Sequence, residues 1–181
     1  MARPLLIASI AAIATTAAIG TAALGQVRHD SNAPIDFAAP HAELQDRSGR
    51  AVLWGGVRLN QGNMTLTAER VTVTYTGQIT DGSPSVSRFD AAGGVTVTRP
   101  DQTARAQYGV YDINKRTITM MGNVSLTQGG NRVSGGRLTL NLDTGRASMD
   151  GSGVGTTKAP DGSVIQSGGR VTGRFTVPKR D

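Results

Sequence analysis

The sequence contains no cysteine, which excludes disulfide bridges, thiolate metal sites and thiol catalysis together. Aromatic side chains are also scarce, with one Trp, three Tyr and three Phe among the 181 residues. Glycine, threonine and valine are frequent instead, and this composition is typical of many short β-strands separated by turns. We therefore expect one domain whose stability comes from strand pairing and packing.

The chain lacks a concentrated basic segment, although its formal net charge is +6. Nucleic-acid binding normally needs a clustered basic face, often with stacking aromatic rings. Because the arginines are spaced along the sequence and aromatic rings are few, we expect no nucleic-acid partner. An acidic or phosphorylated component of the cell envelope fits the charge at least as well. A basic surface that only keeps the protein soluble is the commonest explanation.

An apolar run extends from Leu5 to about Ile19, after the positively charged Arg3. The small residues Ala23 to Gly25 follow it, which predicts a signal peptide that is cleaved before Gln26. Cleavage removes one of the 19 basic residues and none of the 13 acidic ones, so the mature charge is +5. The alternative is an uncleaved membrane anchor, because the 21 residues from Leu5 to Gly25 are enough to cross a bilayer. Several threonines make the run only moderately apolar, which favours cleavage.

Beyond residue 34 the sequence alternates between apolar and polar residues with period two, which predicts half-buried strands. The alternation is clearest from Met121 to Leu142, where two such runs flank the turn-forming Gln128–Asn131. Segments 55–62, 93–100 and 122–129 are versions of one repeat, each followed by another strand 14 residues further on. A repeat of about 30 residues cannot bury its apolar face alone, so the copies must stack into one continuous sheet.

These observations predict an all-β fold: an elongated antiparallel β-jelly roll or half-pipe of repeated short strands, with no helix in the mature chain. We divide the chain into a cleaved signal peptide (1–25), a polar linker (26–33), one β-jelly-roll domain (34–177) and a disordered tail (178–181).

No residue pattern indicates a catalytic or metal site. The two histidines, His29 and His41, precede the first repeat without evident partners, so we expect both at the surface. Acidic residues stand at turns such as Asp81-Gly82 and Asp161-Gly162, where turn geometry explains them. The sequence therefore predicts no enzyme, no catalytic residue, no metal and no cofactor.

The alternation defines a set of inward-facing residues: Leu59, Leu66, Val71, Val73, Phe89, Val95, Val97, Tyr108, Ile118, Met120, Val124, Leu126, Leu138, Leu140 and Met149. An ordinary closed core is the common explanation of such a set. Medium aliphatic and methionine side chains would also suit an open groove for acyl chains. At roughly 0.8 kcal/mol per buried methylene, a chain of about a dozen carbons offers on the order of 10 kcal/mol before ordering costs. The residues expected to line this groove are Leu59, Leu66, Val73, Val97, Met120, Leu126, Leu140 and Met149.

Five segments, by their order and spacing, are similar to a known family: Pro34–Ala38, Trp54–Gly62, Leu66–Val73, Ala106–Asp112 and Gly122–Gly129. The chain resembles the OstA-like family, in particular its LptA-type bridge proteins of lipopolysaccharide transport. The resemblance covers roughly Pro34 to Gly145. Asn141-Leu142 departs from it, because a Tyr-Asp pair is more usual there, and the stretch 151–173 has no recognisable counterpart.

The resemblance implies a periplasmic half-pipe in the Gram-negative envelope, whose interior shields the lipid A acyl chains of lipopolysaccharide, or of a related glycolipid, while the sugars stay in water. It implies transfer from the inner to the outer membrane, docking to Lpt components of both membranes, and head-to-tail self-association through unpaired end strands. Two alternatives stay open: a membrane-anchored LptC-like component of the same system, and a β-solenoid scaffold with a closed interior and no ligand.

Overall fold

The structure is a computed structural model that describes residues 29–77, 84–151, 156–158, 164–166 and 169–175. Its strands are β1 (Ile35–Ala38), β2 (His41–Gln45), β3 (Arg50–Gln61), β4 (Met64–Thr76), β5 (Ser85–Arg99), β6 (Gln102–Asp112), β7 (Thr117–Gln128), β8 (Asn131–Asn141), β9 (Ala147–Asp150), β10 (Thr156–Lys158), β11 (Val164–Gln166) and β12 (Thr172–Arg174). A short 3-10 turn, η1 (Asp46–Ser48), joins β2 to β3.

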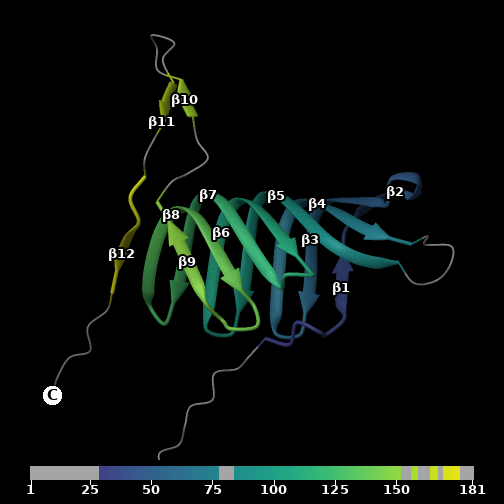
Figure 1. Cartoon of the computed structure of the whole chain (residues 1–181), viewed down its shortest axis with the longest axis horizontal. Coiled ribbons are helices and arrows are strands. Elements are labelled where there is room, and N and C mark those ends of the chain that lie inside the picture. The colour runs from purple at the N-terminus through teal and green to yellow at the C-terminus, as the bar shows by residue number, and fades with distance from the viewer. Residues whose placement is uncertain (1–28, 78–83, 152–155, 159–163, 167–168, 176–181) are drawn as a thin grey trace, which may run out of the picture.

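The strands form a ten-stranded antiparallel sheet in the order β1-β3-β4-β5-β6-β7-β8-β12, with β2 beside β3 and β9 beside β8 (Figure 1). A separate hairpin contains β10 and β11. Consecutive strands from β3 to β8 are neighbours, as expected of stacked repeats. The prediction of an antiparallel all-β fold is confirmed.

Each strand from β3 to β8 bends near its middle, where the pairing register shifts at a β-bulge. On β3, β5 and β7 the bulge contains Gly55-Gly56, Gly93-Gly94 and Gly122-Asn123, and all six residues have positive φ. Glycine is required at Gly93 for a second reason, since an added Cβ would lie 2.7 Å from the Cβ of Glu69. The repeat in the sequence therefore marks a recurring corner. Where the sequence predicted two short strands separated by glycines, the structure has one long strand that bends at the glycines.

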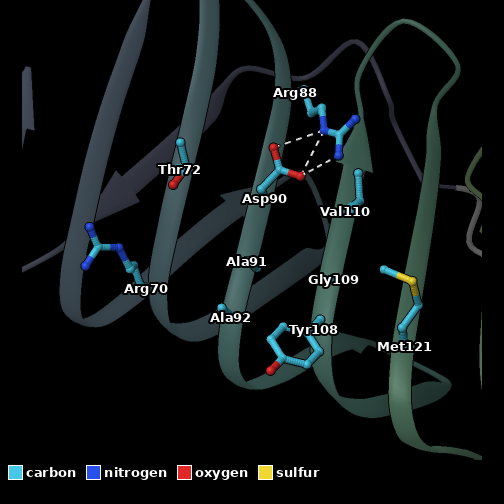
Figure 2. Close-up of a pocket in the computed structure, with 10 residues that line it drawn as sticks. All are labelled: Arg70, Thr72, Arg88, Asp90, Ala91, Ala92, Tyr108, Gly109, Val110 and Met121. Atoms are coloured by element: carbon cyan, nitrogen blue, oxygen red, sulfur yellow. Dashed lines mark hydrogen bonds and ion pairs between the residues drawn. The ribbon is translucent and has the colours of Figure 1, made fainter. Parts of the chain in front are cut away.

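The corners divide the sheet into two walls, and Figure 2 shows neighbouring strands turning from the front wall to the wall behind. Wall A consists of the strand halves 50–54, 70–76, 85–92, 108–112, 117–121 and 137–141. Wall B consists of 57–61, 64–68, 95–99, 102–106, 124–128 and 131–135. At the ends of the sheet, β2 and β9 extend wall A, whereas β1 and β12 extend wall B.

The space between the walls holds one apolar cluster, to which both walls contribute. Residues that pair across neighbouring strands form rows of side chains in this cluster. One row on wall A consists of Val73, Phe89, Tyr111, Ile118 and Leu140. Every residue of the predicted inward set belongs to this cluster except Met149 and Tyr108. Met149 is half-buried and packs against it.

The inward prediction for Tyr108 is wrong, because its side chain is 54% exposed on the outer face. Before the corner of β6 the even-numbered residues face inward, ending with Ala106, whereas after it the inward residues are Gly109 and Tyr111. The bulge between Arg105 and Tyr108 causes this change of parity.

The predicted signal peptide (1–25) and tail (178–181) lie outside the described residues. Within the described residues, no helix is both long enough and apolar enough to cross a membrane.

Candidate functional site

The candidate site is the apolar interior between the walls. All eight residues predicted to line a groove face this interior: Leu59, Leu66, Val73, Val97, Met120, Leu126, Leu140 and Met149. Seven of them are at most 8% exposed, so the protein's own side chains fill the space in this conformation. Their contact with lipid stays a prediction.

The two walls meet again along their free margins, opposite the corners, where turns join successive strands. The buried hydroxyl of Tyr111, on wall A, donates a hydrogen bond of 2.6 Å to Oε1 of Gln61, on wall B. Burial raises the pKa of Tyr111, and the hydrogen bond to Gln61 partly opposes this rise. The hydroxyl therefore keeps its proton and links the margins of the two walls.

Residues 29–33, which we call the N-terminal strap, lie along these margins, and Figure 1 shows this purple segment below the sheet. The strap contacts wall B through His29. Its Nδ1 lies 3.2 Å from Oδ1 of Asn63, and its Nε2 lies 3.3 Å from Oε1 of Gln61. Nε2 of Gln61 also donates to the carbonyl oxygens of residues 31 and 33, each at 3.0 Å. The side chain of Gln61 therefore connects the strap to the margin of wall B.

On the wall A side, the strap contacts the turns after β6 and β8. Arg116 donates to Asn32 at 2.9 Å and forms an ion pair with Asp143 at 3.3 Å. The Ser31 hydroxyl donates to the same carboxylate at 3.1 Å. The strap thus bridges both margins. The expected surface position is wrong for His29, which is 6% exposed, and right for His41, which is exposed and stacks on Trp54.

Both ends of the interior carry exposed apolar side chains. At one end Phe37, which pairs with inward-facing Leu59, is 64% exposed, and Leu44, which pairs with Ala51, is 62% exposed. At the other end Phe175, one residue beyond β12, is 71% exposed. No described strand continues the sheet past β1 and β2 or past β12 and β9. Both ends of the sheet therefore present exposed apolar side chains that no described strand covers.

A buried cation lies on the inner face of wall B at its free margin. Arg99, the last residue of β5, pairs in register with Gln102, the first residue of β6. The two side chains are 7% and 9% exposed. Nε and Nη1 of Arg99 and Oε1 of Gln102 are buried without a hydrogen-bond partner among the described residues. This pair was not singled out from the sequence, although both residues continue the inward period of Val97 and Ala104.

A hollow of about 390 Å³ lies on the outer face of wall A (Figure 2). Its lining includes Arg70, Tyr108, Met121 and the ion pair between Arg88 and Asp90, whose atoms are 2.6 Å apart. This hollow is separate from the apolar interior and is lined by mixed polar and apolar groups.

Among the described residues, no group of three or more His, Asp and Glu side chains could hold a metal ion. The carboxylates of Asp90, Asp112 and Asp143 each pair with a nearby basic side chain. The backbone amide of Lys115 donates to Asp112, and this hydrogen bond is the main cause of the lowered pKa of that carboxyl. These partners give the three acidic residues structural roles at turns and on the sheet surface.

Residues 37–146, which hold most of the ten-stranded sheet, match the family described as LptA/(LptD N-terminal domain) LPS transport protein. The chain belongs to this family. The match confirms the OstA-like resemblance and includes seven of the eight predicted groove residues, the exception being Met149.

Individual relatives agree with this assignment. The chain is 29% identical over 150 residues to an uncharacterized protein of Rhizobium meliloti, covering 81% of each chain. It is 28% identical over 165 residues to the lipopolysaccharide export system protein LptH of Pseudomonas aeruginosa, covering 83% of this chain and 89% of LptH. The crystal structure of LptH, described as the LptA-homologous periplasmic component of the lipopolysaccharide transport device, superposes with a TM-score of 0.65 at 19% identity. It covers 82% of this chain and 99% of that one, and it confirms the jelly-roll fold.

Proposed function

We propose that the protein is a periplasmic bridge that binds lipopolysaccharide through its lipid A acyl chains and passes it from the inner toward the outer membrane. The observation that carries this proposal is the continuous apolar face between the walls, with exposed apolar side chains at both ends of the sheet. Family membership and the role of LptH as a periplasmic component of lipopolysaccharide export support it. The function needs binding and release only, in keeping with the expectation of no enzyme and no cofactor.

Acyl chains would enter the interior by separating the two walls. At the corners, continuous strands join the two walls. At the free margins the walls are joined by side-chain contacts, among them the Tyr111–Gln61 hydrogen bond and the hydrogen bonds of the strap. Opening these contacts costs a few hydrogen bonds of about 1 kcal/mol each. Parting the walls also separates apolar side chains that pack across the interior. An acyl chain of about a dozen methylenes, worth on the order of 10 kcal/mol when buried, would replace those contacts. The margins are therefore the side on which we expect the walls to part.

Site-specific photocrosslinking tests this proposal. A photoreactive amino acid at Met120 or Leu126 faces the interior, and one at the adjacent Thr119 or Thr127 faces outward and serves as the matched control. In cells that make lipopolysaccharide, irradiation should attach it at the two inward positions and not at the outward ones. Equal attachment at all four positions, or none at the inward two, would contradict acyl-chain binding in the interior.

A closed scaffold without a ligand is the second candidate, and the tight packing of the interior favours it. The same experiment separates the two. A scaffold gives no lipopolysaccharide adduct at Met120 or Leu126, even though both variants fold and are exported.

We also propose that copies of the chain associate head to tail, in line with docking to Lpt components at both membranes. The open sheet edges at β1 and β12 can pair with a further strand, and the exposed Phe37 and Phe175 would be covered in such a contact. Sedimentation velocity over a range of concentrations should show weaker association for Phe37→Ser. Tyr108→Ser is the control, since it also removes an exposed ring but lies away from the ends. If the two variants associate equally, the end contact is wrong.

A further inference from the structure

We infer that Arg99 and Gln102 form a binding site for a phosphorylated sugar at the free margin of wall B. This inference rests on the proposed function, and it assigns to the glycolipid a polar subsite beside the apolar interior. The two side chains come from adjacent strands and stand opposite each other in the pairing register. Both point toward the inner face, in line with Val97 and Ala104.

The charge at this site determines the class of ligand. A guanidinium stays protonated in proteins, so Arg99 places a positive charge in a position that is 93% buried. Ion pairs in the described part of the chain do not involve Arg99, and the nearby Asp101 carboxylate accepts a hydrogen bond from Gln128 instead. A buried charge without a partner is strongly destabilising, and native proteins rarely retain one unless it has a use. An anion is the group that would complete this site.

The geometry of the two side chains narrows the choice further. Nε and Nη1 of the guanidinium are both left without a hydrogen-bond partner, so each can donate a charge-assisted hydrogen bond to an anionic oxygen such as those of a phosphate. Oε1 of Gln102 is an unpartnered acceptor, so it needs a donor such as a hydroxyl. A phosphate next to a hydroxyl on a sugar ring supplies both. Free inorganic phosphate shares the anionic part of this chemistry.

The position of the pair fits an amphipathic ligand. Val97 lies two residues before Arg99 on the same face of β5, a distance of roughly 7 Å along the strand. Val97 is 1% exposed and belongs to the apolar cluster. A glycolipid could therefore place its phosphate at Arg99 while its acyl chains enter the interior directly beside it.

The test compares two lipids and three proteins. Binding of radiolabelled bisphosphorylated lipid A and of its phosphate-free form is measured for the exported wild-type chain, Arg99→Met and Arg105→Met. Arg105 is an exposed arginine on the outer face of the same wall, so its variant controls for net charge. We expect the wild type to prefer the phosphorylated form by about tenfold or more, since charge-assisted hydrogen bonds contribute about 1.5–3 kcal/mol. Arg99→Met should reduce this ratio to about one, and Arg105→Met should leave it unchanged.

Stability measurements keep the inference testable if a variant folds poorly. Because Arg99 is unpaired, Arg99→Met should unfold at the same temperature as the wild type or higher; a marked decrease indicates a structural arginine and overturns the inference. Arg99→Lys keeps the charge without the planar donors and should retain part of the preference. A wild-type ratio of about one, or equal effects of Arg99→Met and Arg105→Met, also overturns it.

Failure of the proposed function gives a different result. If the wild type binds neither lipid, the carrier function is wrong, and inorganic phosphate then decides on the anion site. A higher unfolding temperature in phosphate than in chloride of equal ionic strength, lost in Arg99→Met, supports a site for free phosphate. The absence of that increase overturns the site as well.

Discussion

Met120 and Met121 are consecutive residues of β7 on opposite faces of the sheet, so replacing each by alanine compares the interior with the exterior. Met120 is 0% exposed and belongs to the apolar cluster. Met121 is half-buried, lines the outer hollow, and its sulfur is 4.0 Å from Nη2 of Arg137. Deleting the buried thioether should lower the free energy of unfolding by about 2–5 kcal/mol, because contacts are lost and a cavity remains. The same deletion at Met121 should cost about 1 kcal/mol or less.

Urea unfolding followed by circular dichroism measures both variants, and an unchanged m-value shows that the compared states are the same. Losses for Met120→Ala and Met121→Ala that agree within about 0.5 kcal/mol would refute the assignment of the two faces. The lipid adds a second readout. If an acyl chain occupies the interior, it can fill the cavity left at residue 120, and saturating lipid should then reduce the difference between the two variants.

Three further predictions concern the corner, the margins and the N-terminus. Gly93→Ala should lower the unfolding temperature more than Gly94→Ala, because both residues have positive φ but only Gly93 lacks room for a Cβ; equal shifts would contradict the corner geometry. Tyr111→Phe removes the hydrogen bond to Gln61 and should cost about 1 kcal/mol in urea unfolding while speeding lipid uptake; unchanged stability would mean that this bond does not hold the margins together. N-terminal sequencing of the exported protein should begin at Gln26, and an intact N-terminus would favour a membrane anchor.

The period of two predicted the inner face of most strands, because one buried face forces apolar residues to alternate with polar ones. It failed at Tyr108, where the alternation changes parity at the corner of β6. On β3, β5 and β7 the corner contains the glycines that the repeat begins with, such as Gly93-Gly94. At the corresponding place β6 has Ala106-Gln107, which does not differ from an ordinary strand. The glycines of the repeat therefore mark the corners of β3, β5 and β7, and no such signal marks the corner of β6.

Long-range polar contacts were not predictable for a different reason. His29 is buried, and its hydrogen-bond partners follow it by 32 and 34 positions in the sequence. Partners so distant leave no local pattern. Arg99 stands beside the Pro100-Asp101 turn, where an arginine is ordinarily exposed. Its burial follows from the inward period of its own strand, which the sequence does contain. The sequence thus indicated which side chains of this strand face inward, whereas the contacts between the two margins depend on tertiary structure.

The short strands at the two ends of the sheet determine how the proposed stacks would grow. At each end one short strand belongs to wall A and another to wall B, so each end of the sheet presents both walls to a neighbouring copy. In the proposed stacks, an added copy would therefore extend both walls and the apolar face between them. With eight strands along the main path at a spacing of about 4.8 Å, each copy contributes about 38 Å. The length of such an assembly would then be proportional to the number of its copies, as in a pipe built from identical sections.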